Sequence, residues 1–182
     1  MHKHIVTSEG KDIHIFDNTL ESAQRLHVYN FIRNSAYTLN SGPTTNIENL
    51  DEQGLSCFLN YDDVHNLQIF DFMSDELKEL ADPLKCSRAF ILLENGKYYT
   101  RYHTDGLKYK WTMLYYANME WNKDWGGETL FTNEQYDEIE YAVMYKPGRF
   151  VLFDSSIPHK GAQSSIDSPQ FRTIVSMNFD KE

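Results

Sequence analysis

Eight short β-rich segments succeed one another from residue 88 onward, and they constrain the fold more than any other feature of the chain. Turn-forming pairs such as Asn95-Gly96, Gly126-Gly127 and Pro147-Gly148 separate them, because glycine and proline interrupt strands. Strands this short and this regularly spaced are typical of two-sheet jelly rolls and barrels. We predict strands over residues 89–93, 98–103, 111–118, 128–132, 140–145, 150–154, 159–163 and 171–179.

The first half of the chain is predicted to be mostly helical support. Residues 12–16 alternate like a strand, residues 18–34 predict a helix with Asn18 as its N-cap, and a second short helix follows Ser74. Residues 42–63 hold five acidic residues and no Lys or Arg, which indicates a long loop or a lid. We therefore expect one domain over residues 1–182 of mainly β with α (α+β) class. Residues 1–87 would form the support and possible lid, and 88–182 the jelly-roll core.

Composition argues against several partners. The net charge is −10 and no run of Lys or Arg is present, whereas nucleic-acid binding requires a concentrated basic surface. No apolar run approaches the roughly 20 residues that cross a bilayer, and the first residues lack the apolar stretch of a secretory signal. Cys57 and Cys86 indicate two reduced thiols rather than a disulfide framework. We expect a cytoplasmic protein that binds neither nucleic acid nor membranes.

His103, Asp105 and His159 are the strongest candidates for a metal site. Residues i and i+2 of a strand point to the same side, so His103-Thr-Asp105 can direct an imidazole and a carboxylate at one ion. His159, at the start of another predicted strand, can complete the set. Two histidines and one carboxylate with open positions are the ligands of non-haem Fe(II) oxygenases, although the ligand types alone do not select the metal.

Arg172 is the second notable feature. It lies in the alternating segment FRTIVSMNF at residues 171–179, in which Arg172 and Ser176 share one face. An arginine that points inward requires an anionic partner, because an unpaired buried charge is costly. A dicarboxylate ligand with one end on the metal would supply that partner. An outward-facing arginine on an edge strand is the alternative.

These residues leave three functions open. A redox enzyme would use the metal with a dicarboxylate. A zinc hydrolase would use the same three ligands plus water, although no glutamate is evidently placed as its general base. A non-catalytic jelly-roll module would use inward polar residues to hold a small ligand.

Six motifs, in order along the chain, resemble the prolyl-4-hydroxylase-like branch of the Fe(II)/2-oxoglutarate-dependent dioxygenases. The resemblance covers about half of the chain, from residue 89 to residue 179. The motifs are YTRYHTD at 99–105, TMLYYAN at 112–118, WGGETLF at 125–131, KPGRFVLF at 146–153, PH at 158–159, and Arg172 with Ser176.

The resemblance implies a double-stranded β-helix (jelly roll) with Fe(II), 2-oxoglutarate and O2 as cofactor and cosubstrates. It implies that His103, Asp105 and His159 bind iron. It also implies that four residues hold 2-oxoglutarate: Arg172, Ser176, Tyr115 and Tyr99. The reaction it implies is hydroxylation of a C–H bond with release of succinate and CO2. The substrate would be a prolyl peptide, an amino acid or another small molecule.

Overall fold

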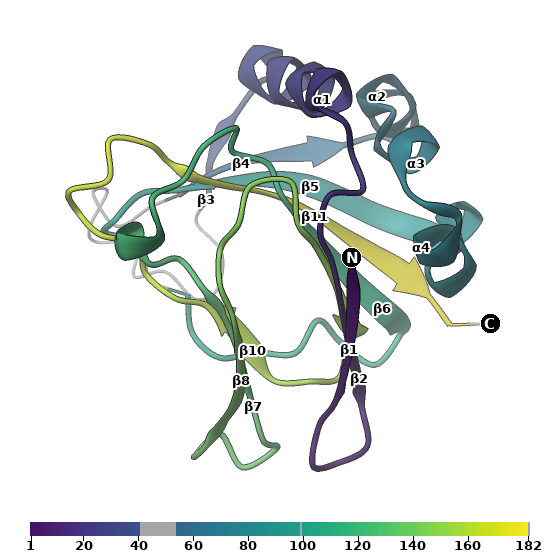
Figure 1. Ribbon diagram of the computed structural model, residues 1–182, viewed down its shortest axis with the longest axis vertical. Helices are drawn as coiled ribbons and strands as arrows, with labels where there is room; N and C mark the ends of the chain where they lie inside the picture. Colours follow the sequence, from purple (N-terminus) through teal and green to yellow (C-terminus); the bar gives the residue numbers. More distant parts are fainter. Residues whose placement is uncertain (41–53, 99, 182) are drawn as a thin grey trace.

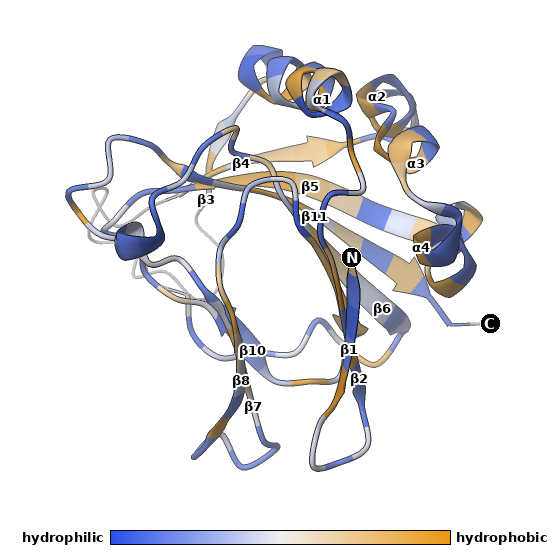
Figure 2. Ribbon diagram, viewed as in Figure 1, coloured by the Kyte–Doolittle hydropathy of each residue, from blue (hydrophilic) through white to orange (hydrophobic). Residues whose placement is uncertain are grey.

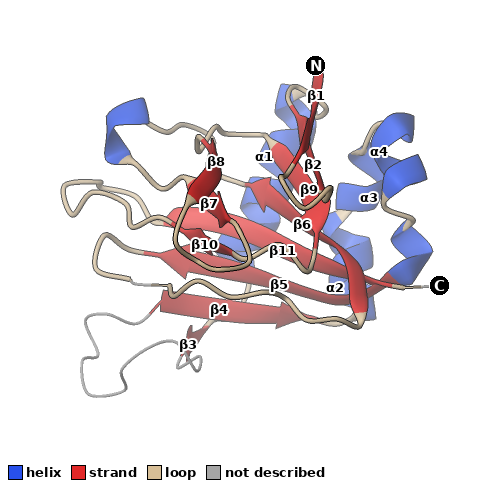
Figure 3. Ribbon diagram, turned by 90° about the horizontal axis from the view of Figure 1, so that it is seen from below, coloured by secondary structure: helices blue, strands red, loops and turns tan. Residues whose placement is uncertain are grey.

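The computed structural model describes residues 1–40, 54–98 and 100–181. Within them, an eight-stranded sheet with the order β1-β2-β9-β6-β11-β5-β4-β3 faces a three-stranded sheet with the order β10-β7-β8. Every strand pair is antiparallel. The predicted jelly-roll class is confirmed. In Figure 1 the helices lie outside the larger sheet, and Figure 3 shows the smaller sheet on its other side.

The larger sheet contains β1 (His2–Val6), β2 (Asp12–Phe16), β3 (Thr38–Asn40), β4 (Gly54–Leu59), β5 (Cys86–Glu94), β6 (Tyr109–Tyr116), β9 (Phe150–Asp154) and β11 (Arg172–Asp180). The smaller sheet contains β7 (Thr129–Thr132), β8 (Ile139–Val143) and β10 (His159–Gly161). The helices are α1 (Ser22–Asn34), α2 (Tyr61–Leu67), α3 (Ile69–Phe72) and α4 (Asp75–Leu80), with 3-10 turns η2 (Pro83–Lys85) and η3 (Lys123–Trp125).

The N-terminal half contributes more to the sheet than we predicted. Strands β1 to β4 all belong to the larger sheet, so the division at residue 87 does not separate helical support from β core. Residues 54–59, expected in a loop or lid, form β4, because residues 55–59 pair in continuous antiparallel register with β5. The rest of the predicted lid that precedes β4 lies outside the described residues.

Two local predictions were also wrong. Helix α1 begins after Glu21, which forms a capping box with Gln24, whereas Asn18 adopts a left-handed backbone with φ 59°. The expected strand over residues 98–103 is absent from its described part, apart from a bridge between His103 and His159. That segment links β5 to β6, which both belong to the larger sheet, and it meets the smaller sheet at the bridge from His103 to His159 of β10.

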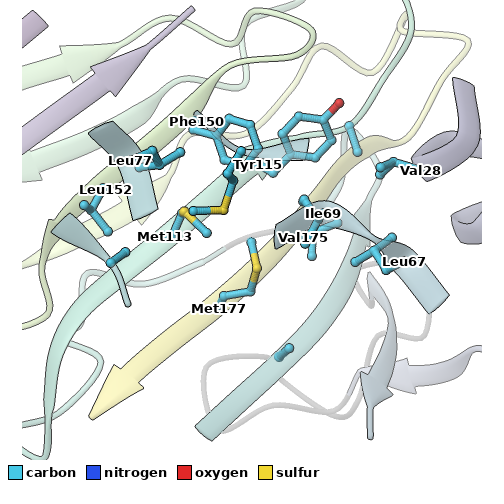
Figure 4. Close-up of a cluster of buried hydrophobic side chains, with 14 of the residues drawn as sticks. Val28, Leu67, Ile69, Leu77, Met113, Tyr115, Phe150, Leu152, Val175 and Met177 are labelled. Carbon is cyan, nitrogen blue, oxygen red and sulfur yellow. The ribbon is translucent and has the colours of Figure 1, made fainter. Parts of the chain in front are cut away.

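A helix-side core fills the space between the helices and the larger sheet. It combines Val28, Leu67, Ile69 and Leu77 from the helical layer with one face of the sheet, as Figure 4 shows. The strands beneath are largely apolar, while much of the outer surface of α1 is hydrophilic (Figure 2). Burial of these apolar side chains is the dominant force that holds the helical layer to the sheet. No helix in the described ranges is long and apolar enough to span a membrane.

An inter-sheet core fills the space between the two sheets, and strand alternation divides residues between the two cores. On β11, Val175, Met177 and Phe179 belong to the helix-side core, whereas Ile174 belongs to the inter-sheet core. Arg172 and Ser176 line the same cavity as Ile174. The predicted common face of Arg172 and Ser176 is confirmed, and it opens between the sheets.

Candidate metal centre

The structure brings His103, Asp105 and His159 together, with ligand atoms all within 4.8 Å of one another. The Nε2 atoms of His103 and His159 lie 3.8 Å and 3.6 Å from the carboxylate oxygens of Asp105. Ligands about 2.0–2.2 Å from one ion lie roughly 3 Å from each other. The three donors therefore fit a single metal ion after small side-chain rotations.

Backbone hydrogen bonds to His159 of β10 and to Ser155, which follows β9, hold this geometry. The N–H of His103 donates to the carbonyl of His159 at 3.0 Å, and the N–H of His159 donates back at 2.9 Å. The N–H of Asp105 donates to the carbonyl of Ser155 at 3.0 Å. The ligands are therefore anchored by main-chain hydrogen bonds although two of them lie outside regular strands.

Each histidine presents the same ring nitrogen to the site. Nδ1 of His103 contacts the carbonyl of Arg101 at 2.9 Å, and Nδ1 of His159 contacts the carbonyl of Ile157 at 3.0 Å. A carbonyl only accepts, so both Nδ1 atoms carry the proton and both Nε2 atoms present lone pairs. Such contacts fix the tautomer and orientation of metal-binding histidines. Burial lowers the pKa of His159, which favours the neutral form that binds metals.

A network of buried polar side chains orients Asp105. The Thr112 hydroxyl donates to Oδ2 of Asp105 at 2.6 Å, which leaves Oδ1 for an ion. Because that uses the only hydroxyl hydrogen of Thr112, Ser155 must donate to Thr112 across the 2.9 Å contact. Asn178 donates to the same hydroxyl oxygen at 3.0 Å. The Asp105 carboxylate is therefore oriented by Thr112 of β6 and, through Thr112, by Asn178 of β11.

A cavity of about 290 Å³ adjoins the three ligands. Its floor includes four successive inward residues of β5, which are Arg88, Phe90, Leu92 and Glu94. Arg172 and Ser176 of β11 line the same cavity and are 1% and 4% exposed. The cavity therefore adjoins both the three candidate metal ligands and a buried cation.

Arg172 already has an anionic partner in the protein. Its Nη1 forms an ion pair with the Glu94 carboxylate, and the two residues are directly opposite each other across β11 and β5. Its Nε donates to the carbonyl of Gly127 at 2.7 Å, and its Nη2 donates to Thr129 at 3.3 Å. The expectation that an external dicarboxylate must balance this charge was incomplete, because Glu94 balances it from within.

Glycines allow the backbone to approach the guanidinium closely. Gly127 has φ +84°, and a Cβ there would lie 3.0 Å from Cδ of Arg172. A Cβ on Gly161 would lie 3.1 Å from Nη1. The rings of Tyr116 and Tyr145 flank the same group, with centroids 5.8 Å and 5.4 Å from Cζ. Arg172 thus lies in a closely fitted pocket.

The two adjacent tyrosines of β6 face opposite ways. Tyr115, predicted to bind 2-oxoglutarate, points into the helix-side core (Figure 4), so that prediction is wrong. Tyr116 is on the inner face, and its hydroxyl contacts Thr129 at 2.6 Å, beside Arg172. Tyr99 lies outside the described residues.

The 2OG-Fe(II) oxygenase superfamily model matches residues 87–180, about half of the chain. The protein belongs to the 2OG-Fe(II) oxygenase superfamily. It is therefore an enzyme of the dioxygenase class, which uses Fe(II), 2-oxoglutarate and O2. The histidine and carboxylate donors described above fit that metal.

Solved structures share this fold at low identity. A Pseudomonas putida prolyl-4-hydroxylase matches with a TM-score of 0.67, 15% identity and coverage of 93% of this chain and 92% of that one. A Trichoplax adhaerens prolyl hydroxylase, in complex with a peptide fragment of the hypoxia inducible factor oxygen degradation domain, matches with a TM-score of 0.64 and 16% identity. The match covers 92% of this chain and 83% of that one. A Burkholderia pseudomallei oxidoreductase of the 2OG-Fe(II) oxygenase family matches with a TM-score of 0.70 and 9% identity. The match covers 93% of this chain and 86% of that one. Among curated proteins, no sequence match was found.

Several residues around the oxygenase centre were missed from the sequence. Glu94 ends an apolar strand, and Thr112 and Asn178 are polar residues within strands whose neighbours are apolar. Such residues are informative because a buried polar group must find a partner. Glu94 pairs with Arg172 78 positions away and Asn178 with Thr112 66 positions away, so only the folded chain identifies those partners.

Proposed function

We propose that this oxygenase is a hydroxylase whose iron is held by His103, Asp105 and His159. When bound, iron with 2-oxoglutarate and O2 supplies the oxidising chemistry that hydroxylates a C–H bond, with release of succinate and CO2. The protein contributes the positions of the ligands and a cavity that limits access of water. The observation that carries the proposal is the presence of three metal donors and a buried arginine around one cavity.

The distal carboxylate of 2-oxoglutarate would bind Arg172 and the Ser176 hydroxyl. Both side chains face the cavity, and a guanidinium binds carboxylates in a fork geometry. Because Glu94 is paired with the same guanidinium, the incoming carboxylate must replace or share that contact. We propose that Glu94 serves as the counter-ion of Arg172 until the cosubstrate arrives.

The primary substrate would occupy the other end of the cavity. Arg88 and Glu94 are six residues apart on one face of β5, which corresponds to about 20 Å and exceeds the length of 2-oxoglutarate. The Arg88 guanidinium lies 4.6 Å from the Phe90 ring centroid, so this end offers an aromatic face and a positive charge. A prolyl peptide is the first candidate, since a similar structure contains a peptide, followed by a free amino acid or another small molecule.

Two measurements test the proposal. Anaerobic addition of Fe(II) and 2-oxoglutarate to the metal-free protein should produce a weak visible charge-transfer band, which His159→Gln should abolish. Succinate release should then be screened across prolyl peptides, free amino acids and small metabolites, with His103→Ala as the inactive control. Tight zinc uptake without the band, together with no succinate from any substrate, would contradict the proposal.

Arg88→Gln tests the assigned substrate end. Because Arg88 lies beyond the reach of the cosubstrate, this variant should raise the KM of the primary substrate and leave the affinity for 2-oxoglutarate unchanged. An equal loss of both affinities would show that the two ends of the cavity have been assigned wrongly. We also propose a cytoplasmic location, in keeping with the two free cysteines.

A further inference from the structure

A second group of metal-binding side chains lies on the β1–β2 hairpin. His4 is directly opposite His14 in the antiparallel register, and alternate residues of a strand share a face. His2 and Asp12 therefore join them on the same face. Three imidazoles and a carboxylate gather there within a stretch of 13 residues.

The donor atoms of His4, Asp12 and His14 all lie within 4.8 Å of one another. Nε2 of His4 is 2.7 Å from a carboxylate oxygen of Asp12, and the rings of His4 and His14 stack with centroids 4.3 Å apart. Zinc ligands at about 2.0–2.1 Å in tetrahedral geometry lie roughly 3.4 Å from each other. Ring rotations and small shifts would place all three donors around one ion.

A chain of contacts orients His14 in the way typical of metal-binding histidines. Glu76 of α4 contacts Nδ1 of His2 at 2.5 Å, and Nε2 of His2 contacts Nδ1 of His14 at 3.1 Å. This leaves Nε2 of His14 for a metal ion. A carboxylate that fixes a ligand through a second ring is the kind of outer support that tunes metal sites.

The hairpin group is separate from the iron centre. Ile13 and Ile15, on either side of His14, point into the inter-sheet core, so His14 points to the other face of the sheet. There its ring packs edge-on against Trp111 with centroids 5.7 Å apart. The hairpin group therefore lies on the helix side of the larger sheet, and the iron cavity lies between the sheets.

The chemistry of the donors indicates the class of ion. Imidazole with one carboxylate suits zinc and the neighbouring transition metals, whereas calcium and magnesium prefer sites built from oxygen.

We propose that His4, Asp12 and His14 form a second metal site that binds Zn²⁺, with His2 and Glu76 as the residues that orient His14. The fourth position is left to water. Bound metal would fasten the edge strand β1 to β2. Because His2 already contacts α4, it would also stiffen the attachment of the hairpin to the helical layer. The proposal does not depend on the oxygenase reaction.

Zinc stoichiometry of the full-length metal-free protein tests this site, measured by competition with a chromophoric chelator. Wild type should bind two equivalents, because zinc also occupies the iron ligands. His4→Gln/Asp12→Asn should bind one, as should His159→Gln, while a variant that combines all three changes should bind none. The matched control is His65→Gln/Asp62→Asn, which makes the same changes on the exposed surface of α2 and should keep both equivalents.

Thermal unfolding distinguishes loss of the zinc site from misfolding of the variants. His4 and Asp12 are 46% and 42% exposed, so their substitution should leave the thermal unfolding of metal-free protein unchanged. In the His159→Gln background, Zn²⁺ should raise the Tm, and adding His4→Gln should remove that increase. A wild-type stoichiometry of one whose single equivalent is lost in His159→Gln, or two equivalents retained in His4→Gln/Asp12→Asn, would overturn the proposal. Two equivalents retained in His159→Gln would instead contradict the assigned iron ligands.

Discussion

Glu94→Gln is the most informative perturbation of this oxygenase. In the free protein the Glu94 carboxylate and the Arg172 guanidinium form an ion pair with side chains 9% and 1% exposed. The distal carboxylate of 2-oxoglutarate would compete for the same cation. Glutamine keeps the shape and one hydrogen bond but removes the competing charge, so the variant should bind 2-oxoglutarate more tightly than wild type.

The size of the effect follows from the contact that is removed. A hydrogen bond to a charged group contributes about 1.5–3 kcal/mol, and each 1.4 kcal/mol is about tenfold in affinity. The variant should therefore bind 2-oxoglutarate between about tenfold and about a hundredfold more tightly. Without cosubstrate, loss of one partner of a buried pair costs about 3–5 kcal/mol. At about 2–4 °C per kcal/mol for a chain of this size, the Tm should fall by about 6 °C or more.

The assay is an anaerobic titration of the iron-loaded protein with 2-oxoglutarate, paired with thermal unfolding. Saturating 2-oxoglutarate should restore most of the lost Tm, since it supplies the missing anion. The affinity for pyruvate, a 2-oxo acid without a distal carboxylate, should be the same in Glu94→Gln as in wild type. Glu138→Gln, an exposed site with the same charge change, is the control. An unchanged or weaker affinity in Glu94→Gln, with a Tm loss that 2-oxoglutarate does not recover, would refute the competition.

Three further predictions concern the surroundings of the site. Thr112→Val should weaken iron binding about 10- to 100-fold, measured by chelator competition, because outer-shell hydrogen bonds hold metal ligands in place; Thr173→Val, whose hydroxyl contacts Phe171, should not. Tyr116→Phe should raise the KM for 2-oxoglutarate several-fold, whereas Tyr115→Phe should leave that KM unchanged. A raised KM in Tyr115→Phe with an unchanged KM in Tyr116→Phe would contradict the assigned faces of β6. Burial acts to raise the pKa of Asp17, but hydrogen bonds from Arg149 and Lys146 outweigh it and hold that pKa below 3.8. The stability that Asp17 contributes is therefore present above pH 3.8 and lost as pH falls through the lowered pKa; the stability difference between wild type and Asp17→Asn in urea unfolding should shrink over the same range.

Local sequence pattern was sufficient to place His103 beside Asp105 and to predict one wall of the cavity. Histidine and aspartate two residues apart need only an extended backbone to face the same way, and alternation on a nine-residue strand places Arg172 and Ser176 together. These conclusions rest on the geometry of a single segment, so they did not require knowledge of its neighbours.

The adjacent tyrosines of β6 show what local sequence pattern cannot predict. Tyr115 and Tyr116 are the same residue type in consecutive positions, so nothing within the segment indicates which one faces the cavity. The register of β6 against β9 and β11 decides it. A register shift by one residue would exchange the two faces of the strand.

The chain's own sequence thus determined most of the strands after residue 88, the donor types and the row of residues beside Arg172, because each depends on backbone periodicity and side-chain chemistry. Only the tertiary structure decided that Arg172 faces Glu94, that Thr112 and Asn178 support Asp105, and that the hairpin histidines lie on the opposite side of the sheet. Those contacts either join residues far apart in the chain or depend on which face of a strand points into which core. Strand pairing determines the first, and the packing of helices against one face of the sheet determines the second.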